Sequence, residues 1–91
     1  MNDLEICKRI AEIEGMSNLL QYYHDCVDNV FNPLTDDALW VKLIEKYEVS
    51  ISFVFCKVLI NLNGVHERNF NDRLSLRRSA MLLIIRAHNE R

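Results

Sequence analysis

Val49-Ser-Ile-Ser-Phe-Val-Phe-Cys-Lys-Val-Leu-Ile-Asn-Leu-Asn-Gly64 is the stretch that decides the fold. In its first half, apolar residues occupy every second position: Val49, Ile51, Phe53 and Phe55. This period of two is typical of a half-buried strand. The alternation then shifts by one position near Cys56-Lys57, which a bulge or a tight bend would produce. Asn63-Gly64 is a strong hairpin signal, and we expect residues 65–70 to form the return strand.

The residues before this stretch have helical spacing instead. The first segment is predicted to be a helix. Asn2 is its candidate N-cap, with Glu5 three residues later as in a capping box, and Gly15 is the residue expected to end it. In the second, residues 17–31 repeat apolar side chains at helical spacing, and Ser17 is a candidate cap. We interpret residues 17–31 as a helix, although their aromatic and β-branched content leaves a strand as the alternative.

A third helix is predicted after the turn at residues 32–35. Thr35 is its candidate cap, and Asp36 and Asp37 fall in its first turn, where the helix dipole favours negative charge. An apolar stripe then follows: Leu39, Trp40, Leu43, Ile44 and Tyr47. This pattern predicts an amphipathic helix that ends near Tyr47.

The last helix is expected from about Leu76 to His88. Its predicted core face consists of Leu76, Ala80, Leu83, Ile84 and Ala87. Met81, Leu82 and Ile85 add apolar character on the remaining sides. Either this helix lies in the centre of the fold, or these three residues form a self-association surface. We therefore expect a homodimer, formed through this helix or through an edge of the sheet.

The predicted order is helix-helix-helix-strand-strand-helix, with a third strand as an option. This order defines an α+β protein in which helices pack on a small antiparallel sheet of two to three strands. A chain of 91 residues has the length of one domain, so we expect residues 1–91 to form a single domain.

Composition favours a cytoplasmic protein. Hydrophobic residues make up 49% of the chain, and its formal net charge is −2. The three cysteines form no disulfide framework, the N-terminus is acidic rather than signal-like, and the longest apolar run, residues 80–85, is too short to span a membrane. Residues 1–64 hold five Lys/Arg and ten Asp/Glu, whereas residues 65–91 hold six Arg and three acids.

Three segments together resemble a known family: Arg9-Ile-Ala-Glu-Ile-Glu-Gly15, Asn32-Pro-Leu-Thr-Asp-Asp-Ala-Leu39 with Lys46-Tyr47, and Ile84-Ile-Arg-Ala-His88. They resemble the phage ABA-sandwich family, which comprises small proteins of tailed bacteriophages and prophages. The resemblance implies a sheet between helical layers and a location in the cytoplasm of a bacterial host. It implies no catalytic residues, because the family has none assigned.

No group of residues has the spacing of an active site or a cofactor site. His24 and Cys26 would point about 160° apart on a helix, and the other cysteines and histidines are scattered. We expect the three cysteines to be small core residues and the histidines to lie at the surface or at strand edges. Asp36 and Asp37 are explained as first-turn helix acids. The sequence therefore predicts no metal, no cofactor and no catalytic residue.

Arginines near the C-terminus are the one feature that favours nucleic acid. The candidate surface for nucleic acid or another partner consists of Arg73, Arg77, Arg78 and Arg86. A solvated or salt-bridged helix face is the favoured interpretation, because the rest of the chain is acidic and would repel phosphates.

From these features we expect a non-catalytic phage or prophage accessory protein. We expect it to bind another protein in the cytoplasm and thereby to modulate or inhibit a host factor. We expect no association with a membrane. A nucleic-acid-binding module that uses the C-terminal arginines is the alternative.

Overall fold

The computed structural model describes residues 1–61 and 64–89. Its elements are α1 (Asp3–Ile13), α2 (Ser17–Tyr22), the 3-10 helix η1 (Val27–Asn29), α3 (Asp37–Lys46), β1 (Ser50–Ser52), β2 (Lys57–Asn61), β3 (Val65–Asn69) and α4 (Arg73–Asn89). The strands form one antiparallel sheet in the order β1-β2-β3. The predicted α+β class is confirmed, and the optional third strand is present.

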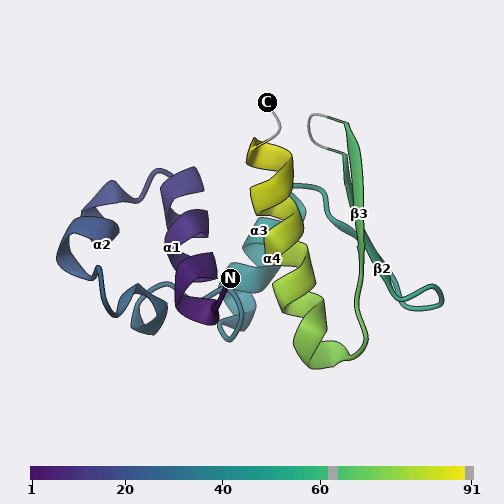
Figure 1. Ribbon diagram of the computed structural model, residues 1–91, viewed down its shortest axis with the longest axis horizontal. Coiled ribbons are helices and arrows are strands. Elements are labelled where there is room, and N and C mark those ends of the chain that lie inside the picture. Colours follow the sequence, from purple (N-terminus) through teal and green to yellow (C-terminus); the bar gives the residue numbers. More distant parts are fainter. Residues whose placement is uncertain (62–63, 90–91) are drawn as a thin grey trace.

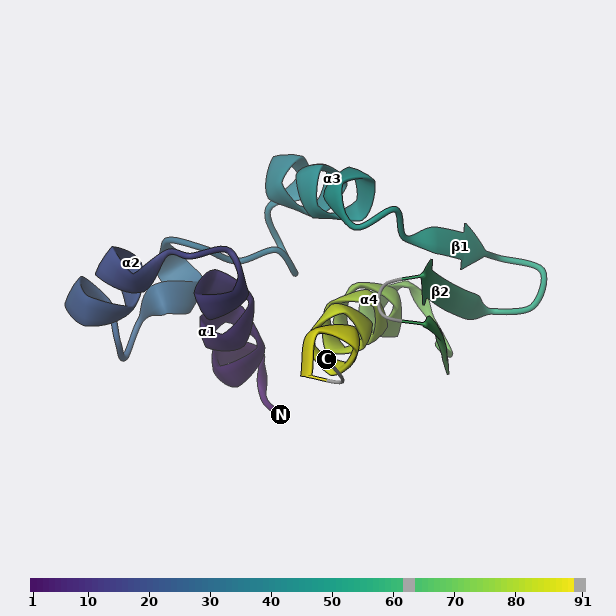
Figure 2. The same ribbon diagram turned by 90° about the horizontal axis from the view of Figure 1, so that it is seen from above.

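The helices lie on one side of the sheet, with α4 between α1 and the strands (Figures 1 and 2). Val58 pairs with Arg68 and Ile60 with His66 on the face toward α4, where Val58, Ile60 and His66 are buried. In the part of the chain that the structure describes, no helix covers the opposite face. The sandwich arrangement implied by the family resemblance is therefore wrong for this region.

The uncovered face is polar enough to be in contact with water. Its side chains come from the alternate positions of the strands: Ser50, Ser52, Lys57, Leu59, Asn61, Val65, Glu67 and Asn69. Lys57 Nζ lies 3.7 Å from Glu67 Oε2 across this face. Only Leu59 and Val65 are apolar, so little surface remains that a second helical layer would bury.

One hydrophobic core joins the helical layer to the sheet. α1 contributes Ile6, Cys7, Ile10 and Ala11, and α4 contributes the largest share. The predicted core face of α4 is confirmed, since Leu76, Ala80, Leu83, Ile84 and Ala87 are all buried. Met81 and Ile85 are buried too. The apolar character around most of α4 is explained by its central place in the fold.

The ends of α1 follow the sequence signals. Asn2 Oδ1 accepts a hydrogen bond from Glu5 N at 2.8 Å, and the Glu5 side chain accepts one from Asn2 N, so the predicted capping box is confirmed. Gly15 has φ +74°, the left-handed conformation expected after the last turn.

The predicted helix over residues 17–31 is wrong in its extent. Helical structure stops at Tyr22 and returns only in the three residues of η1. Ser17 does not cap α2, which has Met16 at its N-cap and no side-chain cap bond. Val27 and Phe31 reach the core from this irregular segment. Tertiary contacts therefore override a helical pattern that no strong local signal supports.

Asp36, rather than Thr35, caps α3. Its Oδ1 accepts a hydrogen bond from Leu39 N at 3.2 Å, whereas Thr35 belongs to the preceding turn. That turn is the predicted one, because Thr35 N donates to the Asn32 carbonyl at 3.2 Å. Threonine and aspartate both cap helices well. Because the turn includes Thr35, the N-cap falls one residue later than predicted, at Asp36.

The shift in alternation near Cys56 is a tight bend. Ser52 pairs with Lys57, so residues 53–56 form the loop of a β1–β2 hairpin. The predicted strand through Phe55 is therefore too long, and it ends at Ser52. The hairpin predicted at Asn63-Gly64 is confirmed in its pairing of Asn61 with Val65, although Asn63 lies outside the described residues.

α4 starts three residues before the predicted position. Ser75 N donates to Asp72 Oδ1 at 2.7 Å, while Ser75 Oγ accepts from Asp72 N at 3.1 Å. This reciprocal pair satisfies the free backbone donors of a helix start, as a capping box does. The residues just before the predicted start therefore supply the first turn of the helix.

Candidate functional site

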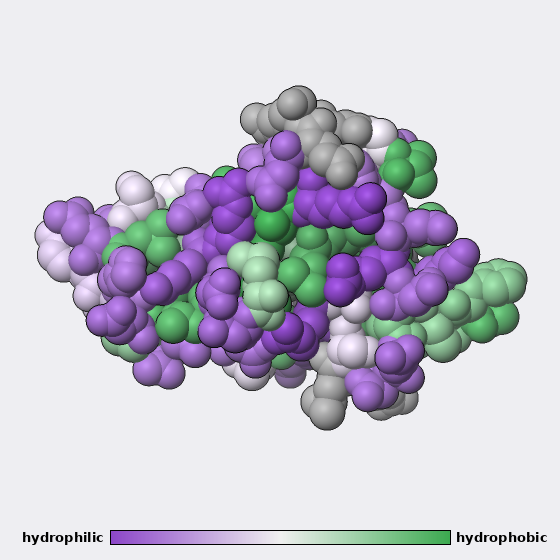
Figure 3. Space-filling view, in the orientation of Figure 1, coloured by the Kyte–Doolittle hydropathy of each residue, from purple (hydrophilic) through white to green (hydrophobic). Residues whose placement is uncertain are grey.

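The β1–β2 loop, residues 53–56, presents the most exposed cluster of large apolar side chains among the described residues. We call it the hairpin tip. Phe53, Val54 and Phe55 are 67%, 87% and 73% exposed. The tip projects from one end of the molecule, where hydrophobic surface gathers in the space-filling view (Figure 3). Apolar clusters of this kind mark interaction sites.

The hairpin tip is held in place at its base. The ring of Phe53 lies edge-on to the buried ring of Phe70, with centroids 6.2 Å apart and planes at 80°. Phe70 N donates to the Cys56 carbonyl at 2.9 Å. Within the loop, Phe55 N donates to Ser52 Oγ at 3.4 Å. These contacts fix the loop while leaving Val54 and Phe55 in solvent.

The sequence did not reveal this exposure. The alternation of Val49, Ile51, Phe53 and Phe55 assigned both phenylalanines to the buried face of a strand. That strand ends at Ser52, and Cys56, the last residue of the loop, has φ +51°. A cysteine in the left-handed conformation could not be predicted from the sequence, because glycine and asparagine are the residues that usually occupy such positions.

Arg77, a residue of the predicted partner surface, makes its contacts within the fold. Its guanidinium lies over the ring of Trp40, 5.3 Å from the centroid, and Nη2 donates to Asp37 Oδ1 at 2.5 Å. Nη1 also reaches the Leu34 carbonyl at 3.5 Å. These contacts join α4 to α3 and its preceding turn, so Arg77 has a structural role.

Arg78 is similarly engaged. Its Nη1 pairs with the Asp3 carboxylate, and its Nη2 donates to the Met1 carbonyl at 2.7 Å. Arg86 is exposed near the other end of α4, and the Arg73 side chain lies outside the described part of the structure. The salt-bridged interpretation is thus confirmed for Arg77 and Arg78.

The predicted self-association surface on α4 is wrong. Met81 is fully buried and Ile85 is 6% exposed, because α4 packs against both α1 and the sheet. Leu82 alone is half-buried. A second copy of the chain cannot use Met81 or Ile85 without opening the core.

The predicted environments of the cysteines and histidines hold only in part. Cys7 is fully buried, and this burial, with Asp28 and Asp3 contributing, raises the pKa of its thiol to about 12. Cys26 and Cys56 are exposed, contrary to prediction, because both fall in loops. His66 lies on the edge strand β3, which fits the predicted edge position, although its side chain is buried. His24 Nδ1 lies 3.1 Å from Asp25 Oδ1.

Over residues 1–61 and 64–89, no three His, Cys, Asp or Glu side chains come together as metal ligands would. Within the same residues, none of the helices combines the length and the apolar character that a membrane span requires. No protein-family model, no curated protein and no solved structure matches the chain. The phage resemblance stays a prediction.

Proposed function

We propose that the chain is a small, non-catalytic phage or prophage accessory protein that binds another protein through the hairpin tip. The partner is a factor of the bacterial host cytoplasm, whose activity the binding modulates or inhibits. The observation that carries the proposal is the exposure of Phe53, Val54 and Phe55 on an anchored loop.

The energetics favour a protein partner for this loop. Full burial of one such apolar side chain stabilises a complex by about 1.5–3 kcal/mol. Aromatic side chains are enriched in the cores of protein interfaces, where a few residues supply most of the affinity. Because the Phe70 contact and the backbone bonds already order the tip, little conformational entropy is lost on binding.

Affinity capture from phage-infected bacterial cells tests the proposal. The wild-type protein should retain a specific host protein, and Val54→Ser combined with Phe55→Ser should lose it. Both substitutions leave the contact between the rings of Phe53 and Phe70 intact. Tyr22→Ser is the matched control, since Tyr22 is 75% exposed on α2 at the opposite end of the molecule (Figure 1). No specific capture, or equal capture by the double variant, contradicts the proposal.

Nucleic-acid binding is the weaker candidate. Arg77 and Arg78 are bound to Asp37 and Asp3, which neutralises the charge that a phosphate backbone would need. Salt-sensitive retention of the wild-type protein on DNA or RNA, lost in Arg68→Gln with Arg86→Gln, would support this alternative instead.

A further inference from the structure

The outer edge of β3 carries a row of main-chain groups that no described residue pairs with. Phe70 N donates to the Cys56 carbonyl at 2.9 Å, which fixes the hydrogen-bonded pairs between β2 and β3. Because such pairs alternate along antiparallel strands, the N–H and C=O groups of Val65 and Glu67 point away from β2. The strand order leaves this side of β3 without a neighbouring strand, and no described helix covers it (Figures 1 and 2).

The opposite edge of the sheet offers less. β1 has three residues, and among them only Ile51 turns its main-chain groups outward. The next outward N–H, that of Val49, already donates to the Ile44 carbonyl at 3.0 Å. Unpaired edges are templates for pairing with another chain, and β3 is the edge that offers the longer row.

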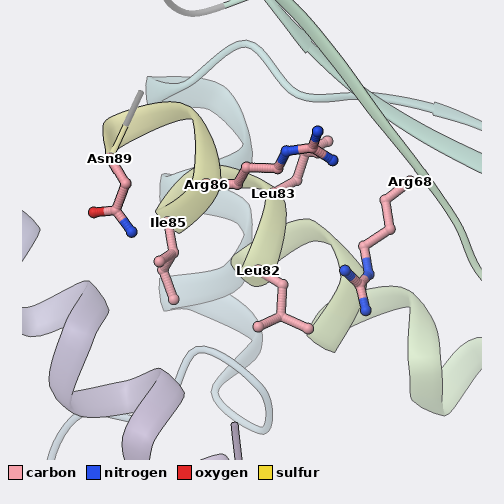
Figure 4. Close-up of a pocket in the computed structure, with 6 residues that line it drawn as sticks. All are labelled: Arg68, Leu82, Leu83, Ile85, Arg86 and Asn89. Carbon is pink, nitrogen blue, oxygen red and sulfur yellow. The ribbon is translucent and has the colours of Figure 1, made fainter. Parts of the chain in front are cut away.

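The charged side chains of β3 leave its outer edge open. Arg68 extends toward Leu82 of α4, on the inner side of the sheet (Figure 4). Glu67 lies on the uncovered face, where its Oε2 is 3.7 Å from Nζ of Lys57 on β2. The Arg68 side chain thus points to α4 and the Glu67 side chain to β2, so neither blocks the approach of a strand to the main chain.

We propose that a second copy of the chain pairs with this edge, antiparallel and centred on His66. The two-fold axis then passes between the His66 residues of the two copies. Val65 of each copy lies opposite Glu67 of the other, and these two residues exchange both of their N–H···O=C bonds. Each copy thereby satisfies the outward main-chain groups of its own Val65 and Glu67, and the two sheets join into one.

The charges favour this register over its neighbour. Centring the dimer on Glu67 would place the Glu67 carboxylates of the two copies directly opposite each other, which is destabilising. That register would also need the Asn69 carbonyl, which already accepts a bond from Ser79 Oγ at 3.3 Å. The row of open acceptors on β3 therefore ends at Glu67 and disfavours the shifted register.

Centring on His66 brings no two carboxylates and no two guanidinium groups face to face. Glu67 lies opposite Val65, whose side chain is 73% exposed in the single chain. Arg68 lies opposite Gly64, where even a Cβ atom would meet nothing closer than 4.0 Å, so the long side chain has room. The edge is thus self-complementary, which favours a second copy over a strand of another protein. The contact does not involve the hairpin tip and does not depend on the proposed function.

Disulfide trapping tests the register. Cys26 and Cys56 are first replaced by serine, which leaves only the buried Cys7. Val65→Cys chains are then mixed with ¹⁵N-labelled Glu67→Cys chains in a glutathione redox buffer, and mass spectrometry identifies each disulfide. Opposed residues of a hydrogen-bonded pair have Cα atoms about 5.5 Å apart, within disulfide range. We expect the mixed dimer to exceed either homodimer by at least about tenfold.

A matched control uses the other edge. Ser50→Cys and Ser52→Cys, in the same background and mixture, should give no excess of the mixed dimer, and an equal excess would contradict the choice of β3. A Glu67→Cys homodimer as the main product would overturn the register. Equal yields of all three dimers, or no dimer, would overturn the proposal and leave the edge to other strands. Both substituted positions on β3 are exposed, and far-UV circular dichroism verifies the fold of each variant.

Discussion

Arg77 of α4 covers the indole ring of Trp40 on α3 and at the same time binds Asp37 at the start of that helix. The Arg77 side chain thereby links α3 and α4, although all the strands of the sheet lie between these two helices along the chain. Arg77 was a candidate for binding a partner, and the structure uses it to hold α3 in place.

Arg77→Gln should lower the free energy of unfolding by about 1 kcal/mol. A cation–π contact at a partly exposed site contributes about 0.5–1 kcal/mol, and the largely exposed Asp37 adds at most about as much. Urea unfolding, followed by far-UV circular dichroism, measures the change, with Lys42→Gln as the control. Identical midpoints for the two variants would show that the Arg77 contacts add nothing to stability.

Cys7 should resist alkylation in the native protein, because its thiol is buried and its pKa is raised to about 12. Iodoacetamide at pH 8 should modify Cys26 and Cys56 first, giving two adducts by mass spectrometry. A third should form only in urea. Modification of Cys7 at the rate of the exposed cysteines would refute its burial.

The same thiol should make stability fall at high pH. The pKa of an ordinary solvated thiol is 9.0, whereas burial raises the pKa of Cys7 to about 12 in the folded chain, so the unfolded state loses its proton first. The stabilisation is fully present below pH 9 and is lost as the pH rises toward 12, by at most about 1.4 kcal/mol per pH unit. Urea midpoints of Cys7→Ala should decline less steeply over this window. Parallel declines would contradict the pKa shift.

Self-association through a sheet edge is still predicted, whereas the α4 surface is excluded. Phe70 N bonds to the Cys56 carbonyl, and hydrogen-bonded pairs alternate along antiparallel strands. The N–H of Glu67 therefore points to the outer edge of β3, where no described strand pairs with it.

Glu67→Pro should then abolish a β3-edge dimer without breaking a β2–β3 bond, since proline is tolerated on edge strands. Analytical ultracentrifugation at micromolar concentration measures both proteins. Only a 10.7 kDa species for the wild-type chain would rule out the dimer in that range.

Local signals predicted the elements that carry strong caps or strict periodicity. The Asn2–Glu5 capping box, the stripe of α3 and the β2–β3 hairpin all appear as expected. The segment 17–31 did not, because its apolar spacing had no cap to fix a helix and two of its residues were needed in the core.

The sites were harder to predict, since they depend on what surrounds each side chain. Periodicity identified Met81 and Ile85 as apolar, but it could not show that α1 and the sheet would cover both sides of α4. It also assigned Phe55 to a strand, and the loop at Cys56 places that ring in solvent. Arg68 and Leu82 meet only in the folded chain.

Site-specific photo-crosslinking tests the role of the hairpin tip most directly. A benzophenone amino acid at position 55, within the tip, should capture one host protein when infected cells are irradiated. The same probe at position 22 on α2 should capture none. A discrete crosslinked product from position 22, with none from position 55, would contradict the account.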